Sequence, residues 1–124
     1  MIAWVLVCIG GPVGAIARWL LDSGVQRRWP SRFPGGILLV NVVGSFVLGA
    51  VLAGTLGWDE RDQWVALLGT GFCGGFTTFS TFAYETVALA DDGAGMLAVV
   101  NVVASVGLSL AAAFAGWWLC GGPT

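Results

Sequence analysis

Histidine is absent from this 124-residue chain, and charge of either sign is scarce, since five basic and seven acidic residues make up only 10% of it. About a quarter of the residues of an ordinary soluble domain are charged. The three cysteines (Cys8, Cys73 and Cys120) lie in separate apolar stretches, and no two form a C-x-x-C pair. Metal–thiolate and redox chemistry are therefore disfavoured, and apolar packing is the better interpretation of all three thiols.

The sequence is rich in long apolar stretches. Hydrophobic residues make up 57% of the chain, and no charged residue occurs in 1–17, 33–58, 63–84 or 93–124. A bilayer core of about 30 Å requires about 20 apolar helical residues to cross it. We predict an all-α integral membrane protein, a single domain over 1–124 with spans near 2–21, 35–57, 63–89 and 95–119.

The first apolar stretch has a second interpretation, a cleaved secretory signal. Such a signal carries a basic region before its apolar run, and no basic residue precedes Arg18 here. A retained membrane span is therefore favoured.

The charges between the spans bear on orientation. Basic residues in short loops tend to remain in the cytoplasm. The predicted first loop holds Arg27, Arg28 and Arg32, whereas the second holds Arg61 alone. This modest bias favours a cytoplasmic first loop with both termini outside, and it is weak enough to allow insertion in both orientations.

Polar residues inside the predicted spans are costly unless protein or water satisfies them. Asn41 lies seven residues after Pro34, which is about 10 Å into the second span. Asn101, Ser105 and Ser109 recur every four residues in the fourth span and so share one helix face. We interpret this row as the lining of a polar path, with coincidental packing as the alternative.

The third span contains the densest signal, the run GTGFCGGFTTFSTF over residues 69–82. Glycine and β-branched residues are poor helix formers, and Gly74 lies about 16 Å beyond Gln63 along a helix. We predict a break there near mid-membrane, with bare carbonyls that suit a small cation or bare amides that suit an anion. Phe76, Phe79 and Phe82 would share one face, either for packing or to turn their positive ring edges toward an anion.

Three segments, GGPVGAIAR (10–18), GILLVNVVGSFVLG (36–49) and GFCGGFTTFSTFAYE (71–85), resemble the CrcB/Fluc fluoride channel family. The match runs in order from the first span into the fourth. The resemblance implies an antiparallel, dual-topology dimer in the cell membrane, with two fluoride paths that passively export the toxic ion from the cytoplasm. Because the chain has no internal repeat, its oppositely oriented partner is either a second copy or a homologue.

The resemblance also implies roles for particular residues. Arg18 corresponds to an arginine near a vestibule, and the backbone carbonyls from Gly74 to Thr77 correspond to ligands of a structural Na+ on the dimer axis. The chain departs from the family at Ile37, where a threonine is frequent, so a hydroxyl one turn before Asn41 is missing. The residues that would line the fluoride path are Asn41, Phe79, Phe82, Asn101, Ser105 and Ser109.

Other function classes fit less well. A small four-helix multidrug exporter requires an acid within the membrane, typically in the first span, and the only acid within these spans is Glu85, near an end. Spacing leaves the role of Glu85 open between helix capping, pairing and a vestibule. A non-transporting assembly subunit would not explain the polar row. No nucleophile–base pair or ligand set indicates an enzyme, and no basic stripe indicates nucleic-acid binding.

Overall fold

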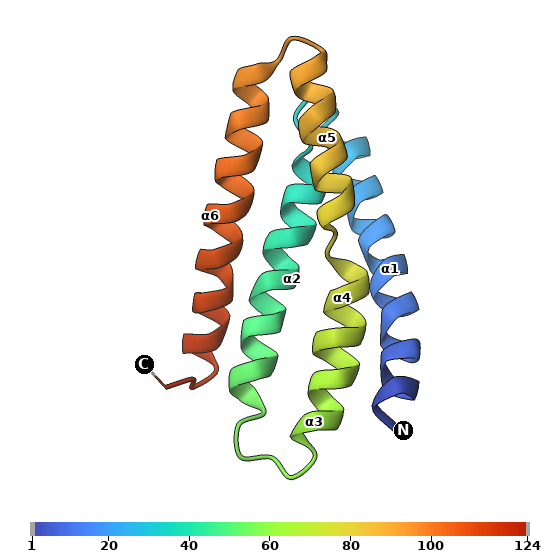
Figure 1. Cartoon of the computed structure of the whole chain (residues 1–124), viewed down its shortest axis with the longest axis vertical. Coiled ribbons are helices and arrows are strands. Elements are labelled where there is room, and N and C mark those ends of the chain that lie inside the picture. The colour runs from blue at the N-terminus through green and yellow to red at the C-terminus, as the bar shows by residue number, and fades with distance from the viewer. Residues whose placement is uncertain (1, 124) are drawn as a thin grey trace.

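The computed structural model describes residues 2–123, and within this range the chain is entirely helical, without a β-strand (Figure 1). Four helical segments are long and apolar enough to cross a membrane. Both termini and the turn after the second segment lie at one end of the bundle. The helices are α1 (Ile2–Arg28), α2 (Gly35–Gly54), α3 (Arg61–Trp64), η1 (Val65–Cys73), α4 (Gly74–Phe76), α5 (Phe79–Asp91) and α6 (Gly95–Leu119).

The first helix extends farther than predicted. We expected a span over 2–21 followed by a loop, but α1 runs for 27 residues and carries Arg27 and Arg28 in its last turn. No proline interrupts the chain between Asp22 and Arg28, and basic side chains stabilise the negative end of a helix dipole. The two arginines therefore belong to a helix longer than the bilayer core rather than to a loop.

The other spans deviate little from their predicted bounds. The second ends at Gly54 rather than at residue 57, where Gly57 adopts a φ of +82° in the following turn. The third occupies 61–91 as several segments, and the fourth coincides with the predicted 95–119. Charged residues lie shortly before α2, shortly after it and shortly before α6, whereas no charged residue follows the end of α6 at Leu119.

Glycines allow two pairs of helices to touch backbone to backbone. On α1, a Cβ added at Gly10 would overlap the Leu67 carbonyl of η1, and one added at Gly14 would overlap the Phe72 carbonyl. Between α2 and α6, a Cβ at Gly49 would overlap the Ala113 carbonyl. Small residues at four-residue spacing permit this close approach in membrane helices.

The third span is broken, but not where the glycines suggested. Gly74 and Gly75 are helical, and the chain becomes extended only at Thr77 and Thr78 before α5 begins at Phe79. The preceding η1 is a nine-residue π-helix, a form that often occurs at functional sites. Gly75 is used instead for contact with α1, since a Cβ there would overlap the Gly11 carbonyl.

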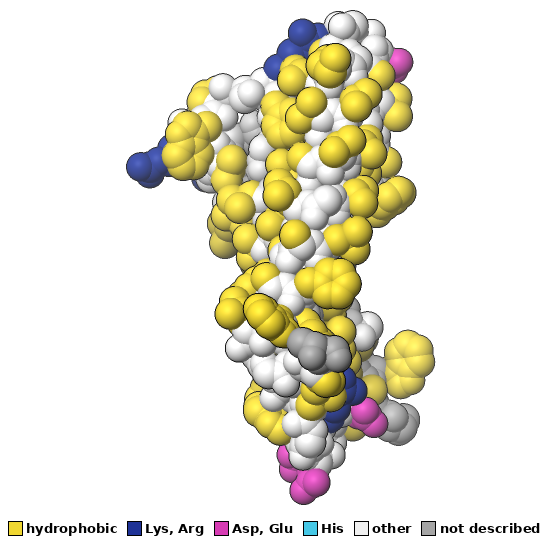
Figure 2. Space-filling model, turned by 90° about the vertical axis from the view of Figure 1, so that its left-hand side faces the viewer, with side chains coloured by type: hydrophobic (Ala, Val, Ile, Leu, Met, Phe, Trp, Pro, Cys, Tyr) yellow, Lys and Arg dark blue, Asp and Glu magenta, His cyan; other side chains and the backbone are white. Residues whose placement is uncertain are grey.

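The surface matches a lipid environment. Hydrophobic side chains cover most of the length of the molecule, while charged side chains gather toward its two ends (Figure 2). Large apolar residues on the outer faces of α1 and α6, such as Trp4, Val13 and Phe114, are exposed. An apolar surface of this extent is stable in a bilayer rather than in water.

Candidate functional site

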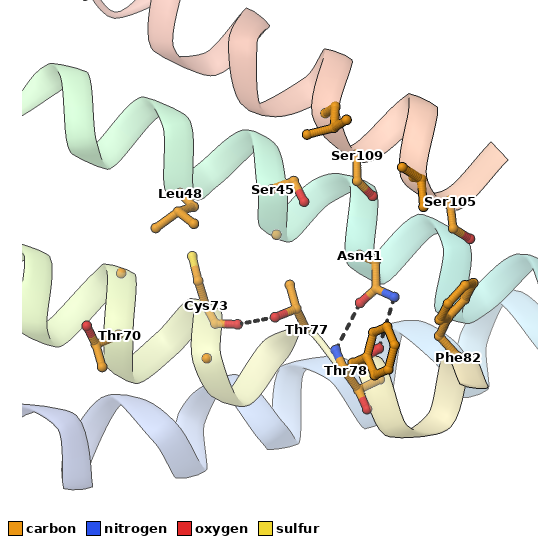
Figure 3. A pocket seen from close by; sticks show the side chains of 16 residues that line it. Asn41, Ser45, Leu48, Thr70, Cys73, Thr77, Thr78, Phe82, Ser105 and Ser109 are labelled. Atoms are coloured by element: carbon orange, nitrogen blue, oxygen red, sulfur yellow. Dashed lines mark hydrogen bonds between the residues drawn. The ribbon is translucent and has the colours of Figure 1, made fainter. Parts of the chain in front are cut away.

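A cavity of about 600 Å³ lies between α2, the broken third span and α6 (Figure 3). Its wall combines apolar residues with polar side chains that the three segments bring together around one space. These polar residues are Asn41, Ser45, Thr70, Thr77, Thr78, Ser105 and Ser109. No acidic or basic residue lines this cavity within the described part of the chain.

Asn41 is held by the backbone of the break. Its Nδ2 donates to the Thr78 carbonyl (3.1 Å), and its Oδ1 accepts from the Thr78 amide (2.9 Å). A backbone N–H can only donate and a backbone carbonyl can only accept, so the side-chain amide has one permitted orientation. Asn41 therefore closes the gap in the helix and brings a fixed N–H donor group to the cavity wall.

Two of the three phenylalanines flank the cavity. Phe79 and Phe82 both line it, with their ring centroids 5.7 Å apart. Phe79 is 79% exposed, so the ring stands at the open side of the cavity. The expectation that Phe76 shares this face is wrong, because it is buried and stacks on Phe72 at 5.4 Å. Because the residues at the break are extended, α5 does not continue the helical turn of α4, and side chains three residues apart across the break point in different directions.

The polar row of α6 divides between two environments. Ser105 and Ser109 line the cavity, whereas Asn101 is not among its lining residues and is only 1% exposed. Asn101 Nδ2 donates to the Thr86 hydroxyl (2.8 Å), and its Oδ1 accepts from Ser105 (3.4 Å). The structure thus brings five of the six predicted path residues to one cavity and places the sixth behind its wall.

Comparison with known proteins shows the family of the chain. A family model described as "CrcB-like protein, Camphor Resistance (CrcB)" matches residues 5–117. The chain belongs to the CrcB family. The predicted resemblance is therefore confirmed, and the four span-length helices make this family member a multi-pass membrane protein.

Curated CrcB relatives share much of the sequence. "Fluoride-specific ion channel FluC 1" of Streptomyces avermitilis is 45% identical, covering 93% of each chain. "Fluoride-specific ion channel FluC" of Pyrococcus abyssi is 47% identical, covering 92% of each chain. "Fluoride-specific ion channel FluC 1" of Leifsonia xyli is 48% identical over 93% of this chain and 84% of its own length.

The break frees two carbonyls that the CrcB resemblance assigns to a Na+ site. In a continuous helix the Gly74 carbonyl would accept from the Thr78 amide, and the Thr77 carbonyl from the Thr81 amide. Here the Thr78 amide donates to Asn41 and the Thr81 amide donates to the Thr78 hydroxyl (3.2 Å). Both carbonyls have lost their helical donors, which fits oxygen coordination of a hard cation.

Arg18 and Glu85 lie away from the large cavity. Neither lines it, and Arg18 is partly buried on α1. Glu85 lines a separate cavity of about 220 Å³ together with Arg32 and Asp92, near the connection between α5 and α6. Its Oε2 atom is buried and has no hydrogen-bond partner among the described residues. The vestibule role of Arg18 in this CrcB protein stays a prediction.

Sequence reasoning missed three kinds of contribution to the site. Ser45 and Thr70 line the cavity, although small hydroxyl residues in apolar helices usually bond only to their own backbone. Thr78 caps α5, and its hydroxyl three residues before Thr81 is a recognisable cap spacing. Thr86 gave no sequence signal, because its partner Asn101 is on another helix.

Proposed function

We propose that this chain is a subunit of a fluoride-selective channel that lets fluoride leave the cytoplasm passively and so lowers its toxicity. The observation that carries the proposal is the cavity wall, where an orientationally fixed amide, serine hydroxyls and two phenylalanine rings meet between helices of membrane-spanning length. The curated relatives that match nearly the whole chain are named as fluoride-specific ion channels.

The chemistry of the wall suits a small anion. Hydroxyl and amide donors replace hydration water, and the edge of an aromatic ring carries positive charge that an anion can approach. Asn41, Ser105 and Ser109 supply the polar contacts, while Phe79 and Phe82 supply the rings. Passive conduction needs no nucleophile or covalent intermediate, so the protein is a channel and not an enzyme.

The subunit works in an antiparallel dimer with two fluoride paths. The 79% exposure of Phe79 leaves a wall of the cavity open in a single chain, and an oppositely oriented partner would complete it. The partner is a second copy of this chain or a homologue with the opposite charge bias. The carbonyls of Gly74 and Thr77 hold a structural Na+ at the two-fold axis, where the ion supplies positive charge to oxygens that have lost their helical donors.

The alternatives have weaker support. A multidrug exporter that exchanges cations for protons requires an acid in its substrate site, and the residues that line the large cavity are uncharged within 2–123. A non-transporting assembly subunit would have no use for an amide, hydroxyls and aromatic rings around a cavity.

Fluoride efflux from liposomes tests the proposal. The purified chain is reconstituted, valinomycin carries the compensating potassium, and a fluoride electrode records release. We expect rapid release of fluoride but not of chloride, which would establish a selective passive path formed by this chain alone and hence a homodimer. If well-folded protein releases no fluoride, co-expression with an oppositely biased homologue is the next test, and failure there favours the assembly subunit.

A further inference from the structure

A chain of hydrogen bonds connects two parts of the cavity wall through residues that do not line it. It begins at the Phe82 carbonyl, passes through the Thr86 hydroxyl and the Asn101 amide, and ends at the Ser105 hydroxyl. Phe82 and Ser105 line the cavity, whereas Thr86 and Asn101 are absent from its lining. Asn101 and Ser105 are 1% and 6% exposed.

Only one direction of donation satisfies this chain. A backbone carbonyl can only accept, so the Thr86 hydroxyl must donate its single proton to Phe82 (2.8 Å). Thr86 can then only accept from Asn101, which must present its Nδ2 group there (2.8 Å). The Asn101 Oδ1 is consequently turned toward Ser105, and Ser105 donates its only proton to that oxygen.

The last bond of the chain is much weaker than the others. Ser105 Oγ and Asn101 Oδ1 are 3.4 Å apart, near the outer limit for a hydrogen bond, while the two bonds of Thr86 are short. The amide of Asn101 is therefore firmly oriented, and the proton of Ser105 is only loosely held. An anion in the cavity can draw that proton away from Asn101 by rotation of the hydroxyl.

We propose that Thr86 and Asn101 are positioning residues that keep a competing acceptor behind Ser105, so that fluoride recruits the Ser105 proton reversibly. This inference rests on the proposed fluoride conduction. A conducting site must bind its ion strongly enough for entry but weakly enough for exit. Competition from Asn101 weakens binding at Ser105 and thereby speeds release.

The change Thr86→Val tests this role, because valine keeps the shape and removes the hydroxyl. An unpaired buried N–H is tolerated less than an unpaired carbonyl, so the Asn101 amide is expected to flip and donate to Ser105. The Ser105 proton then points to the cavity permanently. We expect both the half-saturating fluoride concentration and the maximal efflux rate to fall about three-fold or more, the range of one hydrogen bond.

Three further variants make the test specific. Thr86→Ser keeps the hydroxyl and should restore both quantities to within about two-fold, as expected for an intact bond. Asn101→Leu removes the competing acceptor directly and should also lower the half-saturating concentration, which covers failure of Thr86→Val to fold. In a Ser105→Ala background, Thr86→Val should no longer shift the half-saturating concentration, because the group on which it acts is gone.

Other outcomes would overturn the inference. Damage that is merely structural would lower the rate or the amount of folded protein without tightening fluoride binding. A half-saturating concentration that rises or stays constant in Thr86→Val, or that falls equally in Thr86→Ser, contradicts the positioning role. So does an undiminished shift in the Ser105→Ala background.

A readout without fluoride separates this inference from the proposed function. If the chain releases no fluoride either alone or together with an oppositely biased homologue, the proposed function fails, and thermal unfolding of the same variants still tests the relay. Thr86→Val and Ser105→Ala should then have non-additive effects on the unfolding temperature, because Asn101 couples them. Additive effects would show that no relay joins the two residues.

Discussion

The third span has two halves that differ in how they are held. The first half, η1 and α4, packs against α1 by backbone contact at glycines and buries Phe76. The second half, α5, is fixed by hydrogen bonds, from Asn41 at its start and from Asn101 through Thr86. Phe79 and Phe82 of this half face the cavity.

This difference shows how a membrane protein separates stability from a polar path. Close packing of small residues stabilises helices where neither water nor the hydrophobic effect can do so. The polar side chains that would be costly in lipid then serve as the partners of a broken backbone. Changes at the α1 contacts of the first half should therefore affect folding, and changes at the cavity-facing residues of the second half should affect flux.

The largest effect is expected from Gly14→Leu on α1. The new side chain would overlap the Phe72 carbonyl, and overpacking against a backbone atom costs about 3 kcal/mol or more. We expect a loss of monodisperse protein in size-exclusion chromatography. Gly24→Leu on the same helix is the control, because no atom lies within 4 Å of a Cβ there. Equal behaviour of the two variants would refute the packing role of the first half.

Asn41→Asp should nearly abolish flux. The carboxylate still accepts from the Thr78 amide but no longer donates to the Thr78 carbonyl, so flux is compared only for protein that keeps the elution volume of the wild type. A carboxylate about 4 Å from a fluoride ion repels it by about 4 kcal/mol at an effective dielectric constant of about 20, which is roughly a thousand-fold in rate. Fluoride efflux from liposomes measures the effect. Gln26→Glu makes the same chemical change outside the large cavity and should conduct normally. Wild-type rates in Asn41→Asp would remove this residue from the path.

Three matched changes to isoleucine compare the phenylalanines on either side of the break. Phe82→Ile should lower fluoride efflux about five-fold, the equivalent of about 1 kcal/mol for a ring-edge contact, and Phe79→Ile should act similarly. Both variants should retain the elution volume of the wild type. Phe76→Ile, outside the cavity, should lower thermal stability but not the flux of folded protein. Normal conduction by both cavity variants would show that the ring edges are not used.

The smallest effect is expected from Ser109→Ala. Loss of one hydroxyl from the wall removes a hydrogen bond with a net worth of about 0.5–1.5 kcal/mol, so fluoride efflux should fall about three-fold. Ser23→Ala on α1 removes a hydroxyl that does not line the cavity and should leave the rate unchanged. An equal loss in both variants would indicate general destabilisation instead of a contact in the path.

Much of the architecture could be predicted from the sequence. The ends of the second and fourth spans follow from where charges and turn residues interrupt apolar runs. The end of the first helix does not follow from the charges, because a helix can continue through charged residues, and α1 continues to Arg28. The family was predictable because three motifs lie in order between residues 10 and 85, and that resemblance is confirmed by a family model that matches residues 5–117.

The site was predictable in part. Ser105 and Ser109, which the four-residue spacing put on one face, line the same cavity as Asn41, whereas Asn101 of the same row does not. The equal spacing of Phe76, Phe79 and Phe82 led to a wrong prediction of a shared face. Three-residue spacing implies a shared face only in a continuous helix, and here two extended residues interrupt the helix after Phe76.

The sequence by itself determined that this protein has four segments long and apolar enough to cross a membrane and that the third of them is weak, since apolar length and helix propensity are local properties. The tertiary structure decided where the weak span breaks and which polar groups face the cavity. Gly75 lies within a helix where the absence of a Cβ lets α1 approach closely, and Thr78 becomes extended where Asn41 can satisfy its backbone. Such partners come from distant parts of the chain, so only packing brings them together.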